Sequence, residues 1–197
     1  MTARTLDPLL EAACERLLAV RLASEGLVDC DDVAAVVVGI LQDRNASEEL
    51  RGHAALSLGP ALEYGDMLGF DEPQDLMLSE ACFQQVTALL QRLYFDAETP
   101  ALVRRCVLEA AVRAPADWQR DAVQAAYTHE ERDWRVTAVF CMRFIRGYER
   151  EIIKLLKSPD SDIHFHAIRA ARNWEIDAAW SHLVSLVAGD DLELSHR

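Results

Sequence analysis

Basic side chains recur at one aligned position of the sequence, and they are the residues with the clearest chemistry. The strings that superimpose are ELRGHAALSLG, LVRRCVLEAAV, DWRVTAVFCMR and DIHFHAIRAAR, which bring Arg51, Arg104, Arg135 and His164 to the same position. A guanidinium group binds a carboxylate through two parallel hydrogen bonds. The recurring arginine therefore indicates recognition of an acidic group, either within the chain or on a partner.

Residues four and eight positions later continue the pattern, because a spacing of four keeps side chains on one stripe of a helix. Leu108, Val139 and Ile168 follow the basic residue by four positions in three copies. Stacked helices of this kind would form a groove with an apolar floor and an arginine border, which suits an acidic or amphipathic peptide. The predicted partner-binding residues are Arg104, Arg135, Val139, Arg143, His164, Ile168 and Arg172.

No other pattern in the sequence assigns catalysis. The chain contains no nucleophile elbow, phosphate loop or dinucleotide fingerprint. His164 and His166 are two positions apart, so they point to roughly opposite sides of a helix and cannot clamp one metal ion. The carboxylate pair Glu48-Glu49 falls at a predicted helix end, where it favours the helix dipole or faces solvent. We therefore expect no catalytic residue, no cofactor and no metal, in a protein that is not an enzyme.

The elements that must position these residues are predicted helix pairs, which recur about every thirty residues. A fixed period in a helical chain indicates a solenoid, in which each unit buries its apolar face by stacking on its neighbours. We expect one domain over residues 1–197, with residues 1–30 as an N-terminal cap or degenerate repeat. Residues 177–197 are an incomplete last repeat, which predicts that the natural chain continues past Arg197. The complete predicted repeats span residues 31–62, 79–114, 117–147 and 149–174.

The recurring strings resemble HEAT repeats, and most of all the short HEAT-like repeats of the phycobilisome-lyase type. In that pattern an acid or hydroxyl residue opens the second helix, and an arginine, small residues and Leu-Gly follow. The resemblance covers roughly residues 31–197 and implies an all-α, right-handed α-solenoid of antiparallel helix pairs. It carries little information about function, because such repeats host many unrelated roles. The matching residues of the first copy are Glu49, Arg51, Ala54, Ala55, Leu58 and Gly59.

The resemblance also implies a structural role for the recurring arginine. In HEAT repeats this arginine often pairs with an acid at the preceding turn and forms a ladder between stacked repeats. Glu49, Asp133 and Asp162 lie two positions earlier in three copies, so the sequence leaves ladder and groove both open. The same choice, between locking repeats together and anchoring a partner, applies to the tryptophans near predicted helix ends. They are Trp118, Trp134, Trp174 and Trp180.

Composition narrows the class of protein. The formal net charge is -13, with 18 acidic and 6 basic residues in residues 1–100 and 15 and 14 in residues 101–197. Phosphate contacts dominate affinity for nucleic acids, so this balance argues against a nucleic-acid partner. The five cysteines are widely spaced and odd in number, which disfavours disulfides and zinc ribbons. No apolar run approaches the length of a membrane span and the N-terminus lacks a signal peptide, so we expect a cytoplasmic protein without membrane contact.

One long acidic connection interrupts the predicted repeats. Pro60 lacks the amide hydrogen that helix propagation needs, so we expect the second helix of the first repeat to bend or end there. Residues 64–78 then contain four acids and no base. We expect either an insertion whose Leu68 and Phe70 pack back on the repeats, or a loop that contacts a partner or covers the groove.

These observations together predict a scaffold or adaptor without enzymatic activity, which binds a protein or peptide on the concave face of its helices. The alternative is an accessory factor of a lyase-like or protein-modification system. A nucleic-acid-binding module is a weaker alternative, because it would require a basic concave surface.

Overall fold

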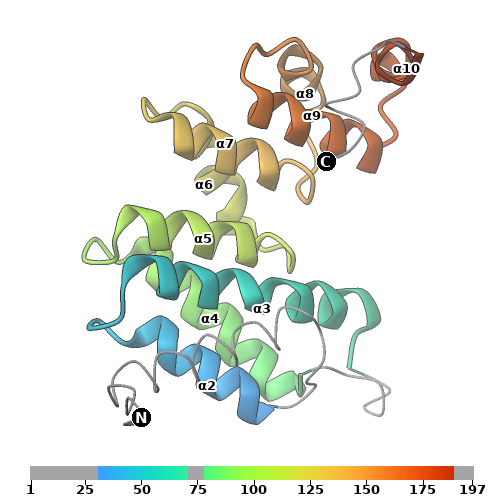
Figure 1. Ribbon diagram of the computed structural model, residues 1–197. Coiled ribbons are helices and arrows are strands. Elements are labelled where there is room, and N and C mark those ends of the chain that lie inside the picture. Colours follow the sequence, from blue (N-terminus) through green and yellow to red (C-terminus); the bar gives the residue numbers. More distant parts are fainter. Residues whose placement is uncertain (1–30, 71–77, 189–197) are drawn as a thin grey trace, which may run out of the picture. The chain divides into compact units, whose positions relative to one another are not determined.

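The computed structural model of the protein describes residues 31–70 and 78–188. This part of the chain is helical and contains no strand, which confirms the all-α prediction for it (Figure 1). The predicted N-terminal cap at residues 1–30 and the end of the last repeat at residues 189–197 lie outside the described residues. The helices are α2 (Asp31–Gln42), α3 (Glu48–Leu68), α4 (Glu80–Phe95), α5 (Ala101–Ala111), α6 (Asp117–Tyr127), α7 (Arg132–Cys141), α8 (Glu149–Leu155), α9 (Ser161–Asn173), a short 3-10 helix η2 (Asp177–Ala179) and α10 (Trp180–Ala188).

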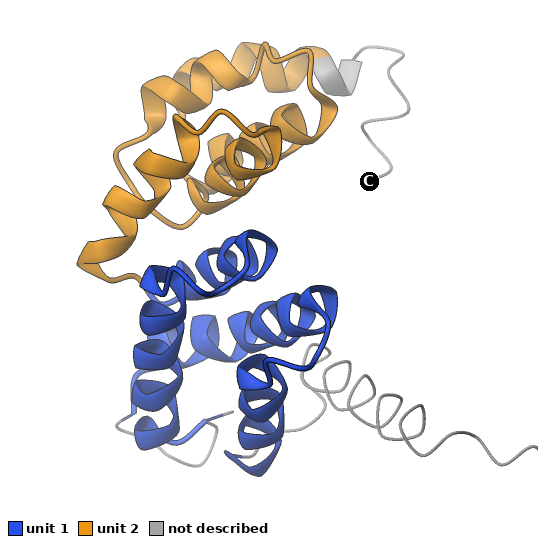
Figure 2. Cartoon of the chain, turned by 90° about the vertical axis from the view of Figure 1, so that its left-hand side faces the viewer, with its two compact units in different colours: residues 1–114 blue, residues 115–197 orange. Residues whose placement is uncertain are grey.

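The chain divides into two compact units, residues 1–114 (unit 1) and residues 115–197 (unit 2), which Figure 2 colours separately. In unit 1, α2 packs against α3, α4 packs against α5, and α3 also packs against α5. In unit 2, α6 packs against α7, α8 packs against α9, and α7 also packs against α9. Consecutive helices therefore form pairs, and within each unit the second helices of the two pairs lie against each other. The arrangement of all pairs into one superhelix stays a prediction.

Hydroxyl and carboxylate side chains define where several helices begin. The Ser47 side chain accepts a hydrogen bond from the amide of Leu50 and so caps α3. Such a bond satisfies one of the amides that the first helical turn leaves without a partner. Ser79 caps α4 in the same way and also donates its hydroxyl hydrogen to Asp31 Oδ2 at 2.6 Å. The start of α4 is therefore tied to the start of α2.

Helix α3 continues through Pro60 to Leu68, which corrects the predicted end of this helix at residue 62. Leu62 is fully buried, and the Gly65 backbone lies so close to Phe83 that an added Cβ would be 3.0 Å from the Phe83 ring. Packing of these later turns outweighs the hydrogen bond that proline cannot donate.

The start of the predicted acidic connection is therefore helical. Beyond α3, the Phe70 ring contacts Phe83 edge-on, with ring centroids 5.1 Å apart. Leu68 stays 48% exposed, so only one of the two expected contacts is made. Residues 71–77, which hold most of the acids of this connection, lie outside the described residues.

Two glycines on α3 allow a close approach to α5. A Cβ on Gly52 would lie 2.9 Å from Cys106 Sγ, and a Cβ on Gly59 would lie 2.7 Å from Arg113 Cδ. These glycines leave room for the Cys106 side chain of α5 and for the side chain of Arg113, just after α5. Arg113 uses this space to reach Glu63, with 2.6 Å between Nη1 and Oε2.

In unit 2, a buried layer of side chains joins α7, α8 and α9. Val139, Met142, Ile152 and Ala167 have no exposed surface. Trp174 follows α9 and donates its indole hydrogen to the carbonyl of Met142 at 2.8 Å. This bond fastens the end of α9 to the end of α7, so Trp174 has the locking role that the sequence left open for the tryptophans.

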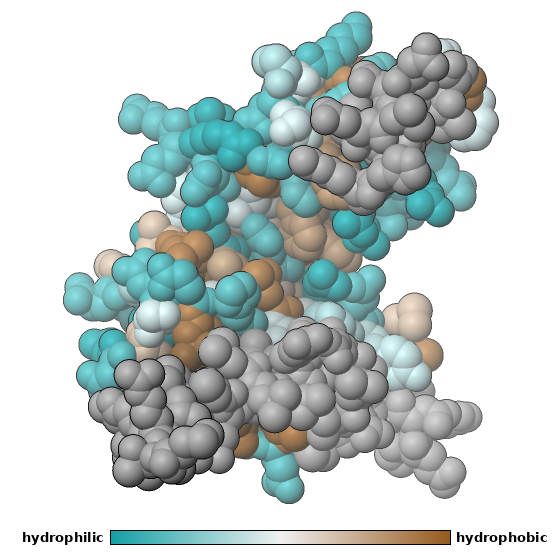
Figure 3. Space-filling view, in the orientation of Figure 1, coloured by the Kyte–Doolittle hydropathy of each residue, from teal (hydrophilic) through white to brown (hydrophobic). Residues whose placement is uncertain are grey.

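The visible surface of the described residues is largely hydrophilic, with smaller hydrophobic areas between the polar ones (Figure 3). Large apolar side chains that remain exposed include Phe95 and Trp180. Among the described residues, no helix combines the length and the apolar character needed to cross a membrane.

Candidate functional site

In two of its copies the recurring arginine binds backbone carbonyls at the end of the helix that precedes it. Arg51 is 6% exposed, and its Nε donates to the carbonyl of Leu41, in the last turn of α2, at 3.0 Å. Arg135 Nη1 donates to the carbonyls of His129 and Glu130, just after α6, at 3.0 and 2.6 Å. The last carbonyls of a helix have no partner within it and favour a cation. The arginine thus closes the turn within its own helix pair.

In unit 2 an ion pair joins consecutive helix pairs, but Arg132 forms it and not one of the recurring arginines for which the ladder was predicted. Arg132, at the start of α7, binds both oxygens of Asp160, with Nε to Oδ2 at 2.6 Å and Nη2 to Oδ1 at 2.8 Å. Its Nη2 also donates to Asp162 Oδ2 at 2.6 Å. The hydrogen bonds from Arg132 hold the pKa of Asp160 below its ordinary value.

Sequence alignment missed Arg132 because it lies three residues before the aligned position held by Arg135. The available signal was its separation from Asp160 and Asp162, which is 28 and 30 residues, or about one repeat. Of the acids proposed for the ladder, Asp162 takes part in it.

The apolar floor of the predicted groove is absent at two of its three positions. Val139 and Leu108 have no exposed surface, so neither can contact a partner while its helix is packed. A spacing of four selects one stripe of a helix, but it does not tell whether that stripe faces solvent or a neighbouring helix. Here the stripe faces the neighbouring helices, and only Ile168 remains partly exposed. Arg104 lies on α5 in unit 1, whereas the other predicted partner-binding residues lie in unit 2.

Two of the predicted partner-binding residues do meet in unit 2. A hollow of about 380 Å³, here called the arginine hollow, is lined by Arg143, Arg169, Arg172 and Asn173. Arg143 follows α7, and the other three residues belong to the last turns of α9. Arg169 was missed by the sequence analysis because it lies outside the four-residue spacing that starts at His164. It lies three positions before Arg172, and this spacing also keeps two side chains on one face of a helix.

Aromatic rings and a backbone contact hold the arginine hollow in shape. The Arg143 guanidinium lies 5.1 Å from the centre of the Phe144 ring, and that of Arg169 lies 5.6 Å from the Phe165 ring. Such stacking orients a guanidinium. Asn173 Nδ2 donates to the Arg143 carbonyl at 2.9 Å, which joins the two sides of the hollow.

The side chains that line the arginine hollow include three arginines and no acid. Within residues 31–70 and 78–188, no carboxylate lies within ion-pair distance of Arg169 or Arg172. The neighbouring His166 is mostly buried, and burial, followed by the charges of Arg169 and Arg143, lowers the pKa of its imidazole below the ordinary value. The hollow therefore favours an anion.

His164, also predicted to bind a partner, instead contacts another histidine. Its Nε2 lies 3.2 Å from Nε2 of His182 on α10, so one ring donates and the other accepts. Among the described residues, no three or more His, Cys, Asp or Glu side chains are grouped to hold a metal ion.

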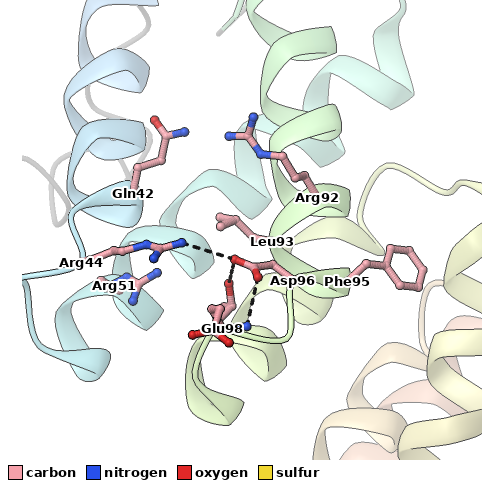
Figure 4. A pocket seen from close by; sticks show the side chains of 9 residues that line it. Gln42, Arg44, Arg51, Arg92, Leu93, Phe95, Asp96 and Glu98 are labelled. Carbon is pink, nitrogen blue, oxygen red and sulfur yellow. Dashed lines mark hydrogen bonds and ion pairs between the residues drawn. The ribbon is translucent and has the colours of Figure 1, made fainter.

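Unit 1 has a second hollow, of about 630 Å³, at the ends of α2 and α4 (Figure 4). Arg44 faces Asp96 across it, with 3.9 Å between Nη2 and Oδ2, and Asp96 also accepts hydrogen bonds from the Glu98 amide and the Thr99 hydroxyl. Three arginines and two carboxylates line this hollow, so its charges largely offset one another. The residues that line it are Gln42, Arg44, Arg51, Arg92, Leu93, Phe95, Asp96, Glu98 and Thr99.

Comparison of the chain with protein-family models, curated proteins and solved structures finds no significant match. The HEAT-like family therefore stays an expectation from the recurring strings. The argument about function depends on the geometry and charge of the arginine hollow.

Proposed function

We propose that this protein is a non-enzymatic adaptor, and that it binds an acidic segment of a partner protein in the arginine hollow of unit 2. The observation that carries the proposal is that three arginines, from α9 and from the residues after α7, line one hollow. Two of the three have no carboxylate partner among the described residues. Arginine is also the residue best suited to bidentate recognition of carboxylates.

A purely structural role accounts for only part of this charge. Cations stabilise the carboxyl-terminal end of a helix, where the dipole is equivalent to about half a negative charge. The ends of α7 and α9 together supply roughly one such charge, whereas Arg169 and Arg172, which have no carboxylate partner among the described residues, bring two positive charges. The excess favours an anion from outside the described residues.

The proposal is tested with a short glutamate-rich peptide and its glutamine counterpart, titrated calorimetrically into the full chain. The glutamate peptide should bind more tightly, because only its carboxylates can accept the guanidinium forks. The variant Arg169→Gln/Arg172→Gln should weaken its binding by about tenfold or more, because charge-assisted hydrogen bonds contribute about 1.5–3 kcal/mol each.

Arg92→Gln is the matched control, because Arg92 is an exposed arginine of the unit 1 hollow and the change removes the same charge. It should leave the affinity for the glutamate peptide unchanged, and far-UV circular dichroism should show native helix content in all variants. Equal affinity of the wild type and the Arg169→Gln/Arg172→Gln variant for the glutamate peptide would refute the proposal.

A further inference from the structure

We infer that the acidic segment of the partner also carries an aromatic side chain, and that this side chain docks in another hollow of unit 2, here called the tryptophan hollow. The inference rests on the proposed function, because it names a further feature of the same partner segment. It follows from the lining of the tryptophan hollow, from an arginine that stacks within it and from the wall that it shares with the arginine hollow.

The tryptophan hollow has the size and the lining of a site for an apolar group. Its volume is about 560 Å³, within the range of roughly 300–1,000 Å³ that is common for ligand sites. Ile145 is almost fully buried, whereas the rings of Phe144 and Trp174 keep part of their surface exposed. Partly exposed rings at the wall of a hollow can bury more apolar area against a partner. The apolar part of the lining is Pro115, Ala116, Phe144, Ile145 and Trp174.

Arg146 favours an aromatic ring over an aliphatic side chain in this hollow. Its guanidinium lies over the Trp174 ring, 4.6 Å from the ring centre. Arg146 is exposed, and within residues 31–70 and 78–188 no carboxylate lies within ion-pair distance of it. A guanidinium is planar and stacks on aromatic faces, so the face turned away from Trp174 can receive a partner ring. An aliphatic side chain gains no such attraction.

The charge of the tryptophan hollow suits the same acidic segment. Its charged lining consists of Arg120 and Arg146 against one acid, Asp117. Arg120 Nη2 donates to the carbonyl of Arg146 at 3.2 Å, which joins α6 to the residues after α7. Positive charge in excess beside an apolar lining complements an aromatic residue that has acids near it in sequence.

The two hollows share a wall of consecutive residues. Arg143 lines the arginine hollow, and the next residue, Phe144, lines the tryptophan hollow. In the same way Asn173 lines the first hollow and Trp174 lines the second. Hydrogen bonds of 2.9 and 2.8 Å, from Asn173 to the Arg143 carbonyl and from Trp174 to the Met142 carbonyl, fasten this wall. Because each extended residue spans about 3.3–3.6 Å, a partner segment needs only about two to four residues to cross from one hollow to the other.

The test uses short peptides that contain a Glu-Glu pair and one variable residue, which is phenylalanine, leucine or alanine. The series places this residue two, three or four positions before or after the pair. Calorimetric titration into the full chain should give, for at least one placement, about tenfold tighter binding of the phenylalanine peptide than of the alanine peptide. The leucine peptide should fall between them, because leucine buries apolar area without stacking on Arg146. A phenylalanine peptide with Gln-Gln in place of Glu-Glu measures the acidic part separately.

Two variants test where the ring binds. Ala116→Phe should fill the tryptophan hollow and remove the preference for phenylalanine, while the preference for Glu-Glu over Gln-Gln remains; Ala116 is exposed, so the fold should tolerate the change. Arg146→Gln should reduce the preference for phenylalanine over leucine, because it removes the stacking cation. The matched control is Arg150→Gln, since Arg150 is an exposed arginine of α8 that lines neither hollow, and this variant should keep both preferences. Far-UV circular dichroism should show native helix content in all of them.

A second measurement does not depend on the spacing in a peptide. N-acetyl-phenylalanine amide is added to the full chain, and the indole N–H resonance of Trp174 is followed by NMR. The ring current of the bound phenylalanine should shift this resonance in the wild type and in Arg150→Gln. In Ala116→Phe, whose hollow is filled, the same addition should leave the resonance unchanged.

The possible results separate the two proposals. Glu-Glu peptides that bind through Arg169 and Arg172, but with equal affinity for phenylalanine and alanine at every placement, overturn the aromatic inference and leave the proposed function standing. Equal affinity for phenylalanine and leucine also overturns it, because a merely apolar hollow accepts either. A preference for phenylalanine that persists in Ala116→Phe places the ring elsewhere and has the same consequence. Equal affinity of the Glu-Glu and Gln-Gln phenylalanine peptides refutes the proposed function, and with it the acidic character of the segment.

Discussion

Replacing Arg51 by methionine tests whether the recurring arginine serves the fold. Arg51 is 6% exposed, and its Nε donates to the Leu41 carbonyl at 3.0 Å. Methionine retains an unbranched apolar stem of similar length, so most of the packing remains while the donor is lost. The change therefore isolates the hydrogen bond that closes the turn between α2 and α3.

The expected loss follows from the burial of this contact. A hydrogen bond from a charged donor contributes about 1.5–3 kcal/mol, and a buried carbonyl deprived of its donor costs about 1–3 kcal/mol. We expect Arg51→Met to lower the free energy of unfolding by about 2 kcal/mol. Because urea reduces this free energy by about 1–3 kcal/mol per molar, the unfolding midpoint should fall by roughly 1 M.

Urea unfolding monitored by far-UV circular dichroism provides the measurement, with Arg92→Met as the control. Arg92 lines the same hollow but is exposed, so its replacement should change stability by less than about 0.5 kcal/mol. If Arg51→Met proves as stable as this control, the carbonyl contact contributes nothing, and the interpretation of the recurring arginine as a structural residue is refuted.

Three further predictions concern particular contacts. Gly52→Leu should destabilise unit 1 by about 1–3 kcal/mol in urea unfolding, because even a Cβ at Gly52 meets Cys106 Sγ at 2.9 Å, and an unchanged midpoint would contradict the close packing. For His166, burial, followed by the neighbouring arginines, lowers the folded pKa below the ordinary 6.5. Its contribution to stability is therefore present above about pH 6.5 and is lost as pH falls through the folded pKa, so His166→Gln should flatten the decline of the urea midpoint below that pH. Trp174→Phe should cost about 1 kcal/mol, because it removes the 2.8 Å bond to the Met142 carbonyl, and a thermal midpoint equal to that of wild type would argue against the locking role.

The helix pairs could be predicted from the sequence because local signals agree with their packing. Ser47 caps α3, and α4 and α6 begin within a residue of the predicted repeat starts at residues 79 and 117. Local rules failed at Pro60. They count the hydrogen bond that proline cannot donate within the helix, but they do not count the packing of the later turns against other helices. The burial of Leu62 and the contact between Gly65 and Phe83 depend on α4 and α5, which no local rule includes.

The candidate site could be predicted only in part. Arg143 and Arg172 were selected by their spacing, and they do line one hollow. The same spacing also selected Val139, which is buried, because periodicity does not distinguish a face that packs on a neighbouring helix from one that faces solvent. Arg169 joins the site through the side of α9 that faces the hollow, which becomes visible only once α7 and α9 are placed together.

The division of the chain has a spectroscopic consequence. All four tryptophans lie in unit 2, and unit 1 contains only tyrosine and phenylalanine among its aromatic residues. Intrinsic tryptophan emission therefore reports on unit 2, and unit 1 contributes no tryptophan emission. Trp174 adjoins Asn173 of the arginine hollow and lies 4.6 Å beneath the Arg146 guanidinium, so the protein carries its own optical reporter next to the proposed binding site.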